Sequence, residues 1–164
     1  MKQFLKKKFR ELKEQLLKSI KKEDVIYLGI KINDEEIRKL CKKLGLTEEQ
    51  MKAIKREIHM TTLYKPKASQ IYGSDVLGKE VTLKIIAFGM LRDENGNIEN
   101  IGLKVLDEEK LSENEIAHVT VAIFGKGKAR NTGKCNFCVP LNEILHGQFA
   151  VFDANNNWAF EVTE

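Results

Sequence analysis

The stretch that most constrains the fold is Ala-His-Val-Thr-Val-Ala-Ile-Phe-Gly, residues 117 to 125. Its β-branched and aromatic residues, followed by a loop rich in glycine and lysine, predict a strand. Side chains alternate between the two faces of a strand, so the valines and the isoleucine form a purely apolar face that must point into a core. The other face is expected to carry His118, Thr120, Ala122 and Phe124. An imidazole and a hydroxyl therefore lie side by side on a rigid support.

The same arrangement occurs a second time in Ile-His-Met-Thr-Thr-Leu-Tyr, residues 58 to 64. On this predicted strand His59 and Thr61 share a face, while Ile58 and Met60 point the other way. The chain has three histidines, and two of them lie in a His-x-Thr arrangement. One such tripeptide alone would be an ordinary polar pair on a sheet. Two of them, on strands a half-domain apart, favour a shared catalytic site.

Two His-x-Thr strands flanked by hydrophobic residues resemble the two-histidine phosphoesterase superfamily, over roughly residues 25 to 152. Its members include cyclic phosphodiesterases, LigT-like RNA end-processing enzymes, the cyclic-phosphate-opening domain of fungal tRNA ligases, and phage enzymes that cut cyclic oligonucleotide signals. The loop rich in glycine and lysine and the later Leu-His-Gly-Gln-Phe look like the tRNA-ligase branch. The resemblance implies an α+β fold in which two antiparallel sheet lobes face each other across a central groove, with flanking helices.

The chemistry that the resemblance implies is hydrolysis of a phosphodiester without a metal or another cofactor. One histidine removes a proton from the attacking water, and the other protonates the leaving oxygen. An imidazole suits both roles because its unperturbed pKa is about 6.5. In the family the first-motif histidine is usually drawn as the acid and the second as the base, which assigns these roles to His59 and His118. Thr61 and Thr120 would donate hydrogen bonds to the nonbridging phosphate oxygens.

A basic loop directly follows the second motif strand. Residues 125 to 134 read Gly-Lys-Gly-Lys-Ala-Arg-Asn-Thr-Gly-Lys. Neither their glycine spacing nor the cysteine that follows fits a phosphate-binding P-loop. The cations Lys126, Lys128, Arg130 and Lys134 suit contacts with phosphates, and a solvated surface loop explains them equally well.

Three aromatic residues are candidates for stacking on a base. Tyr64 ends the first motif strand, and Phe124 is expected on the His118 face. Trp158 is a third candidate, although a tryptophan that covers the edge of a core is the commoner case.

Two substrate classes fit this chemistry. The first is the 2′,3′-cyclic phosphate of an RNA end or a nucleotide, which the likeness to the tRNA-ligase branch favours. The alternative is a cyclic oligonucleotide second messenger, of the kind that phage enzymes cleave. A second alternative is a protein that binds RNA or a nucleotide without turnover, and the two intact His-x-Thr sets argue against it. The protein is expected to act as a monomer.

Composition bounds the class of protein. The chain has 164 residues, 42% of them hydrophobic and 32% charged, as in a single globular domain with a heavily charged surface. Its net charge of +4 permits an anionic ligand. The sequence holds no apolar run long enough to span a membrane, so no membrane association is expected. Three cysteines, an odd number, favour a reducing, cytoplasmic compartment.

Other cysteine and histidine positions are expected to be structural. Cys135-Asn-Phe-Cys138 has the spacing of half a zinc site, but the sequence holds no second pair, so no metal site is expected. His146 precedes a glycine and is expected to cap the end of a helix.

The remaining elements are predicted from periodicity and caps. An apolar stripe among lysines predicts a basic amphipathic helix over residues 1 to 22. Docking of this helix on the sheet is favoured, and binding to RNA or to an anionic membrane surface is the alternative. Residues 23 to 164 are expected to form the phosphoesterase-like domain. Asn33 or Asp34 caps one helix, and Thr47-Glu-Glu-Gln is a capping box for the next. The helix is predicted at 34–44, further strands at 25–32, 81–88, 98–106, 148–152 and 158–162, and a loop at 65–78.

Overall fold

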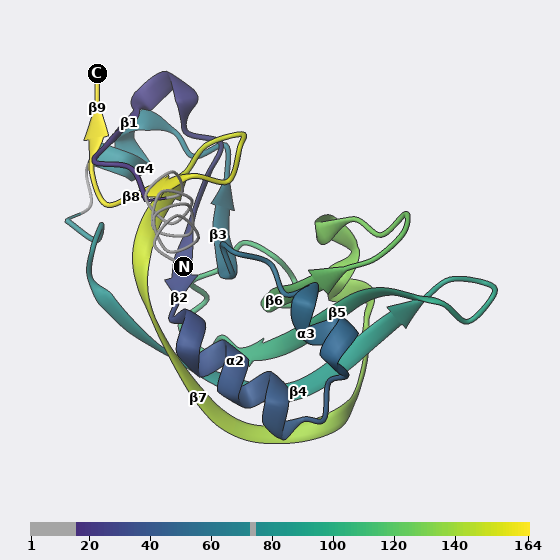
Figure 1. The fold of residues 1–164 in the computed structure, drawn as a ribbon. Coiled ribbons are helices and arrows are strands. Elements are labelled where there is room, and N and C mark those ends of the chain that lie inside the picture. Colours follow the sequence, from purple (N-terminus) through teal and green to yellow (C-terminus); the bar gives the residue numbers. More distant parts are fainter. Residues whose placement is uncertain (1–15, 73–74) are drawn as a thin grey trace, which may run out of the picture.

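The computed structural model describes residues 16–72 and 75–164. These residues form many strands and a few short helices (Figure 1). Its elements are β1 (Ile20–Lys21), η1 (Lys22–Asp24), β2 (Tyr27–Ile32), α2 (Asp34–Lys43), α3 (Glu48–Lys52), β3 (His59–Tyr64), α4 (Ala68–Tyr72), β4 (Glu80–Arg92), β5 (Ile98–Leu106), β6 (His118–Ile123), η2 (Ala129–Lys134), β7 (Asn136–Phe152), β8 (Trp158–Ala159) and β9 (Val162–Thr163).

The main sheet is antiparallel and nearly closes into a barrel. Its strand order is β3-β2-β7-β4-β5-β6, with β8 paired to β7. The first and last strands of this order, β3 and β6, contact each other without pairing as neighbours in the sheet. Figure 1 shows the sheet curling round so that these two strands approach. The mixed α+β class and the antiparallel hairpins predicted from the sequence are confirmed.

The long strand β7 joins the two halves of the sheet. Its first part pairs with β4, and its last part, from Gly147 to Phe152, pairs with β2. His146 lies within this strand, opposite Thr82, so the predicted helix end is wrong. The glycine after it is needed for close packing, because a Cβ at Gly147 would lie 2.6 Å from the carbonyl oxygen of Lys31. A glycine that looks like a helix stop is therefore a point where β2 approaches β7.

The two helices after β2 begin at the predicted caps. The side chain of Asn33 accepts a hydrogen bond from the backbone N–H of Glu36, which makes Asn33 the cap of α2. Both hydrogen bonds of the capping box between Thr47 and Gln50 are present at the start of α3. Three residues of α2 are buried, namely Ile37, Leu40 and Cys41.

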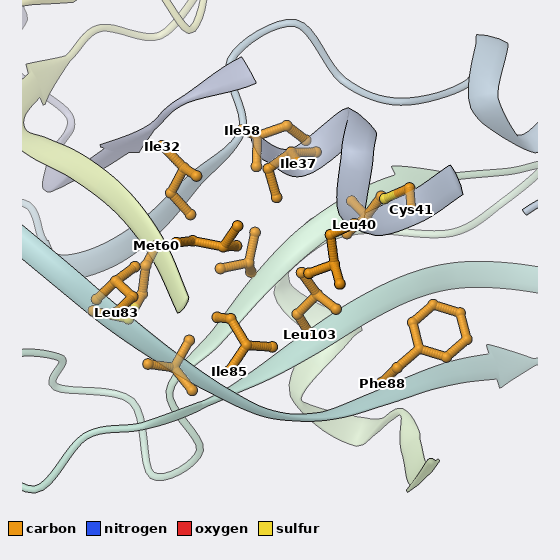
Figure 2. Packing of buried hydrophobic residues seen from close by; sticks show 14 of the residues in the cluster. Ile32, Ile37, Leu40, Cys41, Ile58, Met60, Leu83, Ile85, Phe88 and Leu103 are labelled. Atoms are coloured by element: carbon orange, nitrogen blue, oxygen red, sulfur yellow. The ribbon is translucent and has the colours of Figure 1, made fainter. Parts of the chain in front are cut away.

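The main core lies between α2 and the sheet. Ile58 and Met60 pack there with residues of α2, β2, β4 and β5 (Figure 2). Val119 and Val121 of β6 belong to the same cluster. The predicted inward orientation is therefore confirmed for these four residues of the two motif segments.

The predicted alternation along β6 fails after Val121. The register shifts so that Gly102 faces Thr120 while the preceding residue of β5 faces Ala122, which leaves Val121 as an extra residue. The two bulged residues turn to the same side. Ala122 is therefore fully buried in the core, and Phe124 packs against that core instead of sharing the histidine face.

The N-terminal prediction is only partly covered by the described residues. Residues 1–15 of the expected helix lie outside them. The described remainder forms no α-helix: Leu16 forms an isolated bridge with Trp158, β1 pairs with β9 in parallel, and the short 3-10 helix η1 begins at Lys22. Ile20 is buried against Leu28 and Val151, which explains why this segment is extended along the sheet.

Two C-terminal and loop predictions also have mixed outcomes. β8 pairs with β7 as expected for the last hairpin, whereas β9 leaves it to pair with β1. The predicted loop over residues 65–78 contains the short helix α4.

Within the described residues, none of the helices is both long and apolar enough to cross a membrane.

Candidate functional site

A cleft of about 640 Å³ opens where β3 and β6 meet. Both His-x-Thr motifs line it, one from each strand. The complete lining consists of Tyr27, Lys55, His59, Thr61, Tyr64, Glu113, Asn114, His118, Thr120, Ala129, Arg130 and Asn156.

The seam between the two strands is tied on both sides of the cleft. On one side the Ser112 hydroxyl donates to the carbonyl oxygen of Thr61, and the N–H of Glu113 donates to that of Thr62, each at 2.8 Å. On the other side the N–H of Lys55 donates to the carbonyl oxygen of Val121 at 3.0 Å. These ties join each motif strand to the segment that precedes the other strand, and they support the cleft between the two.

His59 and His118 are oriented by equivalent hydrogen bonds. Nδ1 of His59 lies 2.6 Å from the carbonyl oxygen of Glu57, and Nδ1 of His118 lies 2.7 Å from that of Ile116. A carbonyl oxygen only accepts, so each Nδ1 carries a hydrogen and donates it. In the neutral ring the proton is then absent from Nε2, which is left able to accept one.

His59 sits in an aromatic setting that disfavours its charge. Its ring centroid lies 4.9 Å from that of Tyr27 and 4.8 Å from that of Phe152. Burial lowers the pKa of His59 from 6.5 to about 4, although the hydrogen bond to Glu57 opposes the shift. The positive charge of Lys55 lowers the pKa further. His59 is therefore neutral at neutral pH.

Tyr27 supports His59 from the neighbouring strand. Its ring stacks on Phe152 at 4.6 Å, and its hydroxyl donates to Oδ1 of Asn156 at 2.8 Å. Burial raises the pKa of Tyr27 well above its usual value, so the hydroxyl stays protonated and can keep donating.

Thr120 is in contact with a buried polar pair, Thr132 and Asn100. Its Oγ1 lies 2.7 Å from Oγ1 of Thr132, which is fully buried in η2. Nδ2 of Asn100, also fully buried, donates to the same Thr132 oxygen at 3.0 Å. The methyl group of Thr132 needs the glycine at position 102, since a Cβ there would lie 2.4 Å from Thr132 Cγ2.

The charges of the cleft differ between its two sides. Lys55 lies on the side where its N–H ties β3 to β6, and its Nζ is 3.1 Å from Oε1 of the buried Glu57. Arg130, on η2, adds a second cation. On the other side Glu113 accepts a hydrogen bond from the N–H of Tyr64 at 2.7 Å, and the Tyr64 side chain is 58% exposed. The cleft therefore combines two cations with an exposed ring and hydrogen-bonding groups.

The structure brings together six of the predicted site residues. The lining of the cleft includes His59, Thr61, Tyr64, His118, Thr120 and Arg130.

Five predicted contacts lie elsewhere. Phe124 faces the core because of the bulge in β6. Trp158 is buried with Phe152, and the Nζ of Lys31 lies 4.9 Å from its ring, so it covers the edge of a core. Lys126 and Lys128 are exposed and do not line the cleft. Lys134 is likewise exposed outside the lining.

Several lining residues were missed by sequence reasoning. Tyr27, Lys55, Glu113, Asn114 and Asn156 come from four separate parts of the chain. No local motif marks them, because they gather only when β2 and the seam are in place. One backbone signal exists at Asn156, which has a φ of +59° in the asparagine-rich turn before β8. Asparagine tolerates such a conformation better than most residues.

The cysteines and possible metal ligands complete the inventory of reactive groups. Cys41 and Cys135 are buried, Cys138 is exposed, and all three are free. In the part of the chain that the structure describes, no group of three or more His, Cys, Asp or Glu side chains could hold a metal ion.

Comparisons of the sequence with models of known protein families and with curated proteins gave no match. The geometry and chemistry of the cleft are therefore the basis on which a function can be inferred. Two imidazoles with free Nε2 atoms, two hydroxyls and two cations line one opening, which is a suitable set for a reaction at a phosphate.

Proposed function

We propose that the protein is a metal-independent phosphodiesterase of the two-histidine type, acting on a nucleotide phosphodiester. The observation that carries the proposal is the convergence of His59 and His118 on one cleft with the same ring orientation. Histidines with purely structural roles have no reason to share a cleft and to leave both Nε2 atoms available. Such a pair can supply both the acid and the base for catalysis at phosphorus.

In the proposed reaction His59 acts as the base and His118 as the acid. The oxygen of water attacks phosphorus while its proton moves to Nε2 of His59, and the bond from phosphorus to the leaving oxygen breaks. That oxygen takes a proton from Nε2 of His118. The lowered pKa of His59 supports the role of base, because the ring is already neutral at neutral pH. These roles are the reverse of those that the family resemblance implies.

His118 can hold the required second proton without losing its orientation. An imidazolium ring donates from both nitrogens, so the hydrogen bond to the carbonyl oxygen of Ile116 is kept. A bound phosphate anion favours the charged ring. Thr61 and Thr120 would donate to the nonbridging oxygens, where charge develops, and Lys55 and Arg130 would add positive charge.

The substrate class that we favour is a nucleoside 2′,3′-cyclic phosphate, free or at an RNA end. A cleft of about 640 Å³ is of the size that holds a small ligand, typically about 300–1,000 Å³. The exposed ring of Tyr64 would stack on the base, with Glu113 and Asn114 beside it to bond the base edge. One nucleotide would then occupy the cleft from the histidines to Tyr64.

A cyclic di- or trinucleotide is the second candidate, and the position of the cations favours it over a long RNA. Lys126 and Lys128 lie outside the cleft, whereas Lys55 and Arg130 line it. Two cations match the two or three negative charges of a small cyclic ligand. A protein that binds such a ligand without turnover is the remaining alternative, and a turnover assay separates it.

The fold and location that accompany this function are part of the proposal. The sheet would correspond to the two lobes of the two-histidine fold, one around β2 and β3 and the other around β4, β5 and β6, with β7 shared. Three free cysteines are typical of a reducing compartment such as the cytoplasm. We further propose that a single chain suffices for activity, because both histidines come from it.

The test is a substrate panel with product analysis by chromatography. The purified protein is offered the four nucleoside 2′,3′-cyclic phosphates, a short RNA with a cyclic end, and cyclic di- and trinucleotides. We expect opening of the 2′,3′-cyclic phosphates to a single monophosphate isomer. Rapid linearisation of the cyclic oligonucleotides with the 2′,3′-cyclic substrates untouched would support the second candidate, and ligand binding without any product would refute the enzyme.

A further inference from the structure

A buried chain of side-chain hydrogen bonds runs beneath β6 and ends at Thr120. It begins at Asn100 of β5 and passes through Thr132 of η2, and both side chains are fully buried. The distances are 3.0 Å from Asn100 Nδ2 to Thr132 Oγ1 and 2.7 Å from there to Thr120 Oγ1. Thr132 does not line the cleft, so any effect it has on a ligand passes through Thr120.

The direction of these bonds follows from Asn100. Its Nδ2 also lies 2.8 Å from the carbonyl oxygen of Lys128, which only accepts, so the nitrogen and not the oxygen of the amide faces η2. The NH₂ group then donates to Thr132 Oγ1. The hydroxyl hydrogen and one lone pair of Thr132 then remain, and Thr120 Oγ1 is within reach as acceptor or donor.

The consequence concerns the hydrogen of Thr120. If its oxygen accepts from Thr132, its own hydrogen must point away from Thr132. The protein acceptor on that side, the carbonyl oxygen of Ala129, is 3.4 Å away, which is long for a hydroxyl hydrogen bond. A ligand oxygen in the cleft can therefore compete well for this hydrogen.

We propose that Thr132 is a positioning residue, which accepts from Asn100 and donates to Thr120, so that the Thr120 hydroxyl presents its hydrogen to an anion in the cleft. The bond from Asn100 to Thr132 stands on the geometry, and the direction from Thr132 to Thr120 is the proposed part. Its catalytic consequence rests on the proposed function. The same pair fixes the basic loop, since Asn100 holds the carbonyl of Lys128 and Thr132 fits against the glycine at position 102.

Neutron diffraction on the wild-type protein in D₂O tests the direction without any substrate. We expect deuterium on Thr132 Oγ1 along the line to Thr120 Oγ1, with the Thr120 deuterium turned off that line. Deuterium on Thr120 pointing at Thr132 would overturn the proposal. This result is independent of turnover, so it decides the direction even where the proposed enzyme activity fails.

Turnover of the favoured substrate tests the consequence with four variants. Thr120→Val should lower kcat by roughly tenfold to a hundredfold, and Thr132→Val by about tenfold, with KM little changed. The double variant should be no slower than Thr120→Val, because Thr132 acts only through Thr120. Thr132→Ser, which keeps the hydroxyl, should restore most of the activity. Additive losses in the double variant, or wild-type kcat in Thr132→Val, would contradict the positioning role.

Discussion

His59 and His118, on the two edge strands of the sheet, donate their Nδ1 hydrogens to the carbonyl oxygen two residues before them. Each ring is thus held by the strand that carries it, and each leaves Nε2 available. The two settings differ in burial, since His59 packs against Tyr27 and Phe152 while His118 lies beside the loop glycine at position 133. The same device in two environments is what an acid–base pair requires.

The first prediction concerns the pKa of His59. It should titrate near 4 in the free protein, well below an unperturbed ring. Lys55→Gln should raise this pKa, because removing a nearby positive charge favours the protonated ring. The exposed Lys52→Gln serves as the matched control and should leave it unchanged. NMR titration of the ring nitrogens measures both effects, and a His59 pKa near 6.5 in the wild type would refute the assignment of the base.

The fall of kcat/KM at low pH should report the protonation of His59. The base must be unprotonated, so kcat/KM on this side should fall only as the pH drops towards about 4. In Lys55→Gln the fall should begin at a higher pH. If the pH–rate profile of Lys55→Gln matched that of the wild type, the catalytic base would be a group other than His59.

The stability of the protein should also depend on His59. Below pH 6.5 the unfolded chain protonates this ring while the folded chain does not until about pH 4. The unfolding free energy should therefore fall as the pH is lowered through this window, by up to about 3 kcal/mol from this group. His59→Gln should remove this share of the pH dependence. Denaturant unfolding at several pH values checks it, and parallel curves for wild type and variant would contradict it.

The sequence was informative where the pattern was local. The period-two alternation around His59 and His118 correctly predicted both strands and the shared face of each His-x-Thr pair, and the caps at Asn33 and Thr47 predicted two helix starts. These signals depend on neighbouring residues alone. The face of Phe124 was wrong because a bulge in β6 depends on its register with β5, which no local pattern reports.

Long-range contacts explain the other differences. Tyr27 joins the site through a hydrogen bond to Asn156, which is 129 residues away in the chain. His146 lies in a strand that is held by β4 on one part and β2 on the other, so its neighbourhood does not look like a short strand. Trp158 covers a core because it packs with Phe152 and its ring lies under Nζ of Lys31, and both residues are distant in the sequence.

The exposed ring of Tyr64 should contribute to substrate binding and not to folding. Tyr64→Ala should raise KM by about tenfold, since stacking on one base contributes roughly 1–3 kcal/mol, with kcat nearly unchanged. Trp158→Phe should do the opposite, lowering the melting temperature without a change in KM, because that ring is buried. Steady-state kinetics and thermal melts on both variants distinguish the binding role of Tyr64 from the structural role of Trp158. An unchanged KM in Tyr64→Ala would place the base elsewhere.

Hydrolysis should persist in excess chelator. The two histidines supply the proton transfers, and Lys55 with Arg130 supplies positive charge at the phosphate. Turnover measured before and after incubation with EDTA should agree within about twofold. Complete loss of turnover, restored by zinc or manganese, would defeat the two-histidine mechanism.

The central claim is most directly tested by comparing the three histidines of the chain. His59→Ala and His118→Ala should each lower turnover of the favoured substrate by about a hundredfold or more. His146→Ala is the matched control, because His146 is exposed on β7, bonded to Glu36 and outside the cleft, and its turnover should match the wild type. Circular dichroism should show all three variants folded. Wild-type turnover in either of the first two variants would contradict paired histidine catalysis.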